Sequence, residues 1–101
     1  MELELQPLNL PGIDATRRPL VIAGPCSAET EEQERTTALQ LASNGIRIMR
    51  AGIWNPRTKP GGFEGVGEAG LPWLRRVREE CGLLTATEVA NAHHVKAALE
   101  Y

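Results

Sequence analysis

The chain has 101 residues, less than half of the roughly 250 that a complete (β/α)8 barrel requires. Hydrophobic residues make up 42% of it and charged residues 24%, which is typical of globular proteins and excludes wholesale disorder. The formal net charge of -2 gives no general reason to expect binding to nucleic acid, and no apolar run reaches the length of a membrane span.

Residues 1–19 are predicted to be an N-terminal extension, because they show no helical period and contain three prolines and one glycine (Pro7, Pro11, Gly12 and Pro19). The first residues are acidic and lack the apolar segment of a signal peptide, which favours a cytoplasmic protein. The two cysteines, Cys26 and Cys81, are therefore expected to be reduced thiols. The remaining residues, 20–101, are expected to form the α/β domain.

Within residues 20–101, short apolar runs alternate with amphipathic segments. The runs at 20–24, 46–49 and 83–87 predict strands, and the first of these is expected to be buried on both faces. Helices are predicted over residues 30–44, 68–81 and from 88 to the end. The order β-α-β-α-β-α predicts a parallel sheet with right-handed crossovers.

The predicted helices carry recognisable start, stop and packing signals. The first begins at a capping-box pattern, Thr30 to Gln33, and ends at Asn44-Gly45. Gly82 is expected to cap the second helix. The apolar faces are expected at Leu39 and Ala42 in the first helix, at Leu71, Leu74, Val77 and Cys81 in the second, and at Val89, Ala92, Val95 and Leu99 in the third.

Polar and reactive residues gather where the predicted strands end, which is the edge of a parallel sheet where ligands bind. Gly24-Pro25-Cys26-Ser27-Ala28-Glu29 follows the first strand, and Thr87-Glu88 follows the third. After the second strand, Arg50, Arg57 and Lys59 provide three cations within eleven residues, which suits a phosphorylated or carboxylated small molecule. A solvated loop is the alternative interpretation of these cations.

Cys26 lies in a Gly-Pro turn at a strand end, where a thiolate is placed to act as a nucleophile or a metal ligand. Cys81 lies on the inner stripe of a helix and is expected to be a core residue. His93 and His94 are adjacent on a helix, so their side chains diverge by about 100° and cannot form a zinc-binding pair. Surface or packing roles are expected for both histidines.

In combination, Gly24-Pro25-Cys26-Ser27-Ala28-Glu29, Arg50-Ala51-Gly52 and Pro56-Arg57-Thr58 resemble the 3-deoxy-D-arabino-heptulosonate 7-phosphate (DAHP) synthases. The resemblance is greatest to the type I-beta group, through Phe63-Glu64-Gly65-Val66-Gly67, and Thr87-Glu88-Val89 also fits. It extends from about residue 18 to the end of the chain. It implies that residues 20–101 are the first three βα units of a TIM (β/α)8 barrel, from a homo-oligomeric transferase of the shikimate pathway.

The resemblance also implies an activity and a set of site residues. These enzymes condense phosphoenolpyruvate with erythrose 4-phosphate, release phosphate and require a divalent metal. Cys26 matches a metal ligand of the family, and its thiolate suits Mn, Fe, Co or Zn better than Mg. Arg50 matches a residue that binds phosphoenolpyruvate, and Pro56, Arg57 and Thr58 match the segment that holds erythrose 4-phosphate. Lys59 and Glu88 are further candidates for substrate binding at the same edge.

One catalytic position departs from the family pattern. The residue before Pro56-Arg57-Thr58 is a lysine in the family and Asn55 here, which removes a charge and a possible proton donor. The family's other metal ligands, a histidine, a glutamate and an aspartate, come from later strands, so these 101 residues alone are expected to be inactive. A non-catalytic or degenerate relative that binds a phosphorylated ligand or a partner subunit is the alternative hypothesis.

A sister family, 3-deoxy-D-manno-octulosonate 8-phosphate synthase, performs similar chemistry on arabinose 5-phosphate. Its corresponding loop has an Ala-Asn-Arg-Ser type of sequence. Pro56-Arg57-Thr58 argues against membership in that family.

Overall fold

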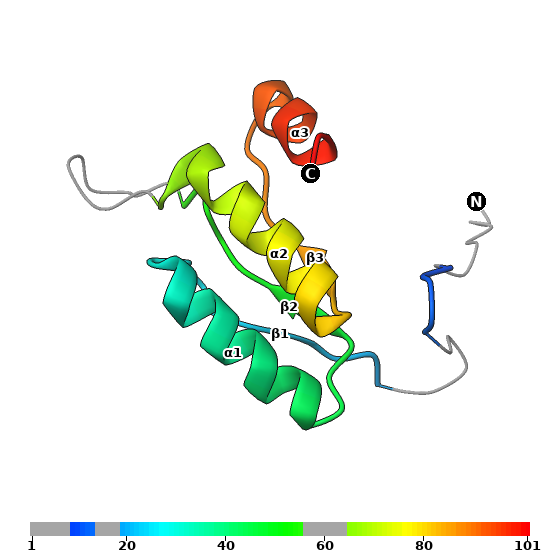
Figure 1. The fold of residues 1–101 in the computed structure, drawn as a ribbon. Coiled ribbons are helices and arrows are strands. Elements are labelled where there is room, and N and C mark those ends of the chain that lie inside the picture. The colour runs from blue at the N-terminus through cyan, green and yellow to red at the C-terminus, as the bar shows by residue number, and fades with distance from the viewer. Residues whose placement is uncertain (1–8, 14–18, 56–64) are drawn as a thin grey trace, which may run out of the picture.

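The computed structural model describes residues 9–13, 19–55 and 65–101. Its elements, in chain order, are β1 (Ile22–Ala23), α1 (Glu31–Ser43), β2 (Ile48–Arg50), the short 3-10 helix η1 (Gly67–Gly70), α2 (Leu71–Cys81), β3 (Leu84–Ala86) and α3 (Ala92–Leu99). The predicted alternation of strands and helices is confirmed, although each strand is shorter than the apolar run that predicted it (Figure 1).

The three strands form one parallel sheet in the order β1-β2-β3. Ile48 of β2 is paired with Ile22 of β1 and with Leu84 of β3, so the strands are closely aligned. Helices α1 and α2 pack against each other on one side of this sheet, and α3 lies farther along, beyond the end of β3 (Figure 1). This alignment brings the segments that follow the three strands to the same edge of the sheet.

Helix α1 begins and ends where its sequence predicts. The Oγ1 atom of Thr30 accepts a hydrogen bond from the backbone N–H of Gln33 at 3.1 Å, which confirms the N-cap. The Gln33 side chain accepts from the backbone N–H of Glu29 at 3.0 Å, one residue before the cap. Asn44 is the C-cap and Gly45 follows with φ +80, a conformation that favours glycine.

The predicted inner face of α1 is wrong at Leu39, which is 53% exposed. The buried residues of this helix are Glu34 and Ala38, and the partly buried Leu41 and Ala42 pack nearby. These four positions follow the helical spacing i, i+4, i+7 and i+8. The stripe is difficult to find in the sequence because a charged residue occupies its first position.

Glu34 is an acidic side chain enclosed in the fold. It is only 1% exposed, and neither carboxyl oxygen accepts a hydrogen bond from any group in the described ranges. Burial disfavours the ionised form and raises the pKa of this carboxyl from 4.5 to about 7. The folded state therefore favours the protonated form of Glu34 more than the unfolded state does.

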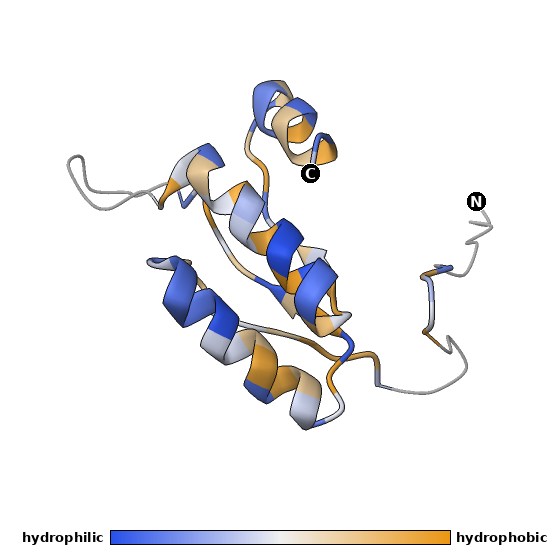
Figure 2. Ribbon diagram, viewed as in Figure 1, coloured by the Kyte–Doolittle hydropathy of each residue, from blue (hydrophilic) through white to orange (hydrophobic). Residues whose placement is uncertain are grey.

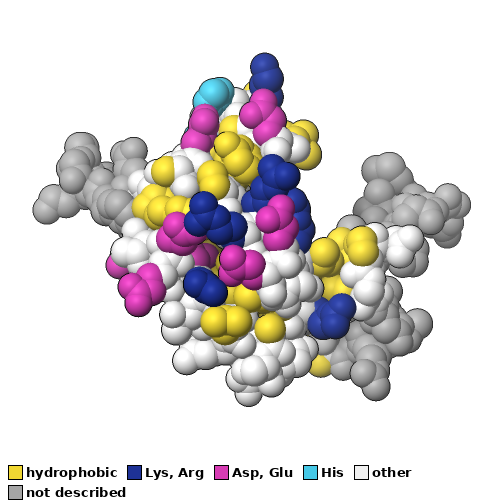
Figure 3. Space-filling view, in the orientation of Figure 1, with side chains coloured by type: hydrophobic (Ala, Val, Ile, Leu, Met, Phe, Trp, Pro, Cys, Tyr) yellow, Lys and Arg dark blue, Asp and Glu magenta, His cyan; other side chains and the backbone are white. Residues whose placement is uncertain are grey.

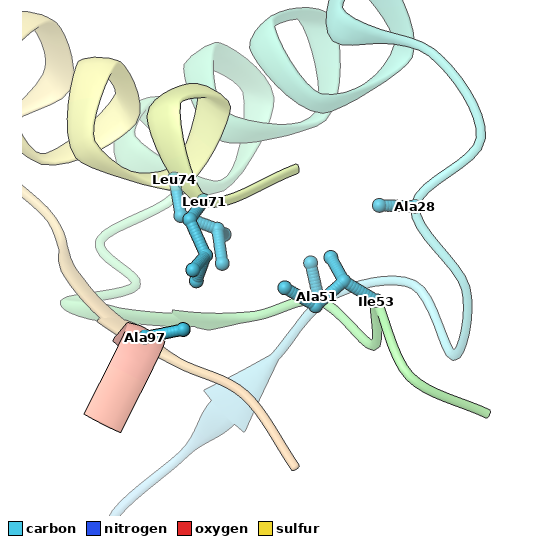
Figure 4. Packing of buried hydrophobic residues seen from close by; sticks show 6 residues of the cluster. All are labelled: Ala28, Ala51, Ile53, Leu71, Leu74 and Ala97. Atoms are coloured by element: carbon cyan, nitrogen blue, oxygen red, sulfur yellow. The ribbon is translucent and has the colours of Figure 1, made fainter. Parts of the chain in front are cut away.

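The buried residues form two clusters on the helix-covered side of the sheet. The first contains Ala28, Ala51, Ile53, Leu71, Leu74 and Ala97 (Figure 4). The second contains Ala38, Met49, Val77 and Leu83. Helix α2 contributes to both through Leu71, Leu74 and Val77, and Cys81 packs partly buried against the second, so its predicted stripe is confirmed. The outer face of α2 is mostly hydrophilic (Figure 2).

The prediction that the first strand is buried on both faces is wrong. Leu20, Val21 and Ile22 are 47%, 47% and 50% exposed. Helix α1 covers only one side of the sheet, and in the described part of the chain β1 has β2 as its single neighbour. An apolar run indicates a segment that is stabilised by burial, but it is buried only where other elements pack against it.

The predicted apolar face of the third helix is also wrong. The residue of α3 that is buried is Ala97, whose methyl group packs into the first cluster. Val89, Val95 and Leu99 are 46%, 42% and 83% exposed, and they line a groove of about 290 Å³ with residues of α2 and β3. The helix contacts the first cluster through the small side chains of Ala97 and Ala98.

Charges of both signs cover the outer surface of α1 and α2 (Figure 3). Ion pairs join Arg35 to Glu80 and Arg76 to Glu31 across the two helices, and Arg75 to Glu79 along α2. The described helices include none that is long and apolar enough to cross a membrane.

Candidate functional site

The candidate site is the edge of the sheet at which the three strands end. The backbone leaves β1 through Gly24 and Pro25 to reach Cys26, and it leaves β2 through Ala51 and Gly52. The N-termini of α1 and α2 lie near this same edge, which is to the left in Figure 1. The structure therefore brings together the segments that carry Cys26, Arg50, Asn55 and Glu88.

The turn after β1 packs directly on the backbone that follows β2. The N–H of Ala28 donates to the carbonyl oxygen of Gly52 at 2.8 Å. A Cβ atom at Gly52 would overlap the carbonyl oxygen of Cys26, and one at Gly24 would overlap the carbonyl oxygen of Arg50. Glycine at both positions is thus what allows the two segments to approach so closely.

Cys26 has an exposed side chain on this tightly held turn. The Nδ2 atom of Asn55 donates to the carbonyl oxygen of Cys26 at 3.4 Å. Asn55, predicted to occupy a catalytic position, thus lies beside the predicted metal ligand and contacts its backbone. The thiol remains available at the surface, which is the setting required for a nucleophile or a metal ligand.

Arg50 ends β2 and forms an ion pair with Glu88, with 3.3 Å between Nη2 and Oε1. The Arg50 side chain is 36% exposed and that of Glu88 is 64% exposed, so solvent reaches both groups and the pair contributes little stability. The sequence segment from Arg50 to Lys59 contains no acidic residue, but the fold supplies one from the end of β3. Glu88 holds the guanidinium at the edge of the sheet, where an incoming anion can replace the carboxylate as its partner.

The segment after β3 is joined to the segment after β2 by two further bonds. The hydroxyl of Thr87 donates to the carbonyl oxygen of Ala51 at 2.9 Å. The N–H of Ala51 donates to the carbonyl oxygen of Ala86 at 3.1 Å. Glu88 therefore follows a well-anchored residue, which accounts for its position opposite Arg50.

The predicted substrate-binding residues Pro56, Arg57, Thr58 and Lys59 lie outside the described residues, as does Phe63-Glu64 of the glycine-rich segment. Among the residues that the structure describes, no three His, Cys, Asp or Glu side chains are grouped closely enough to hold a metal ion. Cys26 fits the role of one ligand in such a site, because it is an exposed thiol at the strand ends, but the described residues do not complete the site.

Two aromatic residues near the site were not identified as site residues from the sequence. Trp54, which lies between Ile53 and Asn55, stacks on the imidazole of His94 in α3 with ring centroids 4.0 Å apart. Adjacent His93 forms a 2.8 Å contact between its Nε2 atom and Oε1 of Glu68 in η1. The expected surface and packing roles of these histidines fit this arrangement, but their partners are distant in the sequence and no local pattern indicates them.

Comparison with known proteins tests the resemblance that the motifs indicate. The family model described as "DAHP synthetase I family" matches residues 11–101. The chain belongs to the DAHP synthetase I family. Its membership covers α1 to α3 and every described residue of the candidate site.

Two solved structures and a curated relative support the same assignment. The chain is 38% identical over 81 residues to the phospho-2-dehydro-3-deoxyheptonate aldolase of Thermotoga maritima, an alignment that covers 80% of this chain. The crystal structure of the Thermotoga maritima phospho-2-dehydro-3-deoxyheptonate aldolase (DAHP synthase) matches 79% of this chain with a TM-score of 0.71 and 36% identity. A truncated form of the Thermotoga maritima 3-deoxy-D-arabino-heptulosonate 7-phosphate synthase matches 79% with a TM-score of 0.65 and 35% identity.

The share of each relative that is matched is much smaller. The chain spans 24% of the curated relative and 22% and 28% of the two solved chains. The matched part contains three parallel strands with their helices.

Proposed function

We propose that these residues belong to a 3-deoxy-7-phosphoheptulonate synthase, which condenses phosphoenolpyruvate with erythrose 4-phosphate and releases phosphate. In this proposal, residues 20–101 supply the first three βα units of a TIM barrel, preceded by an extension over residues 1–19. The observation that carries it is the placement of Cys26 and Arg50 at the ends of adjacent strands, within a chain of the DAHP synthetase I family.

The substrates explain the chemistry of the edge. Both are phosphorylated anions, and Arg50 provides a partly exposed cation that can exchange Glu88 for the phosphate or carboxylate of phosphoenolpyruvate. Pro56, Arg57, Thr58 and Lys59 are proposed to hold erythrose 4-phosphate. Holding two anions side by side supplies much of the rate of a condensation, because it removes the entropy cost of bringing the reactants together.

Cys26 is the proposed metal ligand of this segment. Its exposed thiol suits a divalent Mn, Fe, Co or Zn ion, with further ligands supplied from outside these residues. When bound, such an ion would act as a Lewis acid that polarises the aldehyde of erythrose 4-phosphate. With one ligand present, the 101 residues alone are not expected to turn over substrate, and we propose a cytoplasmic homo-oligomer as the active form.

Asn55 favours a second candidate function, that of a relative which binds a phosphorylated ligand or a partner subunit without catalysis. Its amide contacts the carbonyl oxygen of Cys26, whereas the family has a lysine at this position. An amide lacks the positive charge of a lysine, and a charge-assisted hydrogen bond is worth about 1.5–3 kcal/mol.

The experiment that separates the two candidates is an assay of the full-length gene product. Consumption of phosphoenolpyruvate, followed by its absorbance, is measured with and without erythrose 4-phosphate and with and without a chelator. We expect activity that needs both substrates and is lost with the chelator. Activity that is absent in the presence of each of the four metals would refute the synthase and favour the non-catalytic relative.

The variant Asn55→Lys tests the one catalytic position at which this chain differs from the family pattern. Restoring a cation beside Cys26 is expected to raise kcat/KM by about tenfold or more, because the charge can then act on phosphoenolpyruvate and the aldehyde. The matched control is Asn44→Lys, an exposed change at the C-cap of α1, remote from the edge of the sheet. An unchanged kcat/KM in Asn55→Lys would show that this protein does not need the lysine.

A further inference from the structure

The two adjacent histidines of α3 contact two separate parts of the chain between β2 and α2: Trp54, shortly after β2, and Glu68 of η1. His94 stacks on Trp54 with an interplanar angle of 5°, so the two rings are nearly parallel. His93 contacts Glu68 of η1 at 2.8 Å. Trp54 and Glu68 are fourteen positions apart in the chain, yet neighbouring residues of one helix hold both.

Backbone contacts also join the two segments that carry Trp54 and Glu68. The N–H of Gly67 donates to the carbonyl oxygen of Ile53 at 2.8 Å. Gly65 lies so close to the same carbonyl that a Cβ atom there would overlap it. The backbone at Gly65–Gly67 therefore lies beside the backbone at Ile53. His94 contacts the first of these segments through Trp54, and His93 contacts the second through Glu68.

The imidazole of His94 is held in place by its own helix. Its Nδ1 atom accepts a hydrogen bond from the backbone N–H of Ala90 at 3.1 Å. Its backbone N–H donates to Oδ1 of Asn91, the N-cap of α3, at 2.9 Å. The ring is thus a fixed platform for the indole, because its rotation would break the bond from Ala90.

Trp54 connects the fixed ring of His94 to the candidate site. It directly precedes Asn55, whose amide contacts the carbonyl oxygen of Cys26 at 3.4 Å. Trp54 is half-buried and packs against the core cluster that contains Ala51 and Ile53. The position of Asn55 over the Cys26 turn therefore depends on an indole that lies between the core and His94.

The geometry points to His93 and His94 as a histidine clamp: two positioning residues that fix the backbone at Trp54 and Asn55 relative to Cys26. They touch no reacting group in this arrangement and act through the segment that they hold. Their effect on catalysis rests on the proposed synthase function, whereas their effect on the backbone does not.

The test compares three variants of the full-length gene product. His94→Ala removes the stacking ring, His94→Phe keeps a flat ring without the nitrogens, and Lys96→Ala is a matched control on an exposed residue of the same helix. The readouts are kcat, the KM for phosphoenolpyruvate, and the hydrogen exchange rate of the Gly67 amide, which reports on the bond to Ile53.

We expect His94→Ala to lower kcat by about tenfold or more, since a misplacement of about 1 Å can cost about a hundredfold. The KM for phosphoenolpyruvate should change much less, because Arg50 lies in β2 itself, outside the clamped segment. Exchange of the Gly67 amide should accelerate by about tenfold or more. His94→Phe should restore part of each value, because it keeps a ring to stack on Trp54 but loses the bond from Ala90 that fixes the ring, and Lys96→Ala should leave all three values unchanged.

Equal Gly67 exchange rates in His94→Ala and Lys96→Ala would overturn the clamp, as would a His94→Phe variant as impaired as His94→Ala. If the unsubstituted protein has no activity, the proposed synthase fails and the exchange rates alone decide on the clamp. If His94→Ala does not fold, Glu68→Ala removes the exposed partner of His93 and is expected to accelerate Gly67 exchange in the same way.

Discussion

Replacing Glu34 with glutamine is expected to remove a large part of the pH dependence of stability. The carboxyl has a pKa of about 7 in the folded state against 4.5 when unperturbed. Below pH 4.5 it is protonated in both states, and its contribution to stability is greatest. Between these values the unfolded state releases the proton and the folded state keeps it, so the free energy of unfolding falls by about 1.4 kcal/mol per pH unit.

The full loss is therefore about 3 kcal/mol once the pH exceeds 7. The measurement is urea-induced unfolding at pH values from 4.5 to 8.5, for the unsubstituted protein and for Glu34→Gln. Other titrating groups are common to both proteins, so the difference between the two curves isolates this carboxyl. It should grow across pH 4.5 to 7 and then level off, with glutamine the more stable at high pH.

The matched control is Glu32→Gln, an exposed acidic residue in the same turn of α1, which should shift the curve little at any pH. Parallel curves for the unsubstituted protein and Glu34→Gln would refute the reasoning. They would mean that the carboxyl finds a partner or solvent in the folded state and is not desolvated.

Two further predictions concern the ends of elements. Thr30→Ala should lower the free energy of unfolding, measured with urea, by about 1 kcal/mol, because the N–H of Gln33 loses its acceptor. The control Thr36→Ala, in the exposed middle of α1, should not destabilise the protein. Equal effects of the two changes would show that the Thr30 cap does not stabilise the fold. Gly52→Ala should cost about 1–3 kcal/mol by the same measurement, since the new Cβ overlaps the carbonyl oxygen of Cys26 and forces the two segments apart; a neutral effect would show that they do not pack as described.

The local features of the fold could be read from the sequence. Thr30 caps α1, Gly82 ends α2 in the left-handed conformation, and the spacing of Leu71, Leu74 and Val77 matches the buried stripe of α2. Each of these depends on residues within a few positions of one another, where backbone hydrogen bonding and the helical period set the outcome.

The errors fall where burial depends on distant elements. Leu39 has the hydrophobicity of a core residue, yet Glu34 occupies the buried position, because the packing of α1 against α2 and the sheet determines which face turns inward. The same applies to α3, where Ala97 is buried and Leu99 is 83% exposed. A local pattern indicates an apolar face but does not tell which neighbour covers it.

By itself, the sequence determined the order of the elements, both ends of α1, the C-terminal end of α2 and the motifs Gly24-Pro25-Cys26 and Arg50-Ala51-Gly52 that carry the resemblance to the family. The third helix is predicted to begin at residue 88, whereas α3 begins at Ala92. The tertiary structure alone decided the pairing of Arg50 with Glu88, the contact of Asn55 with Cys26 and the stacking of Trp54 on His94. The reason is physical. Caps and turns form between near neighbours in the chain, whereas these contacts join separate βα units and exist only when the strands lie in parallel register.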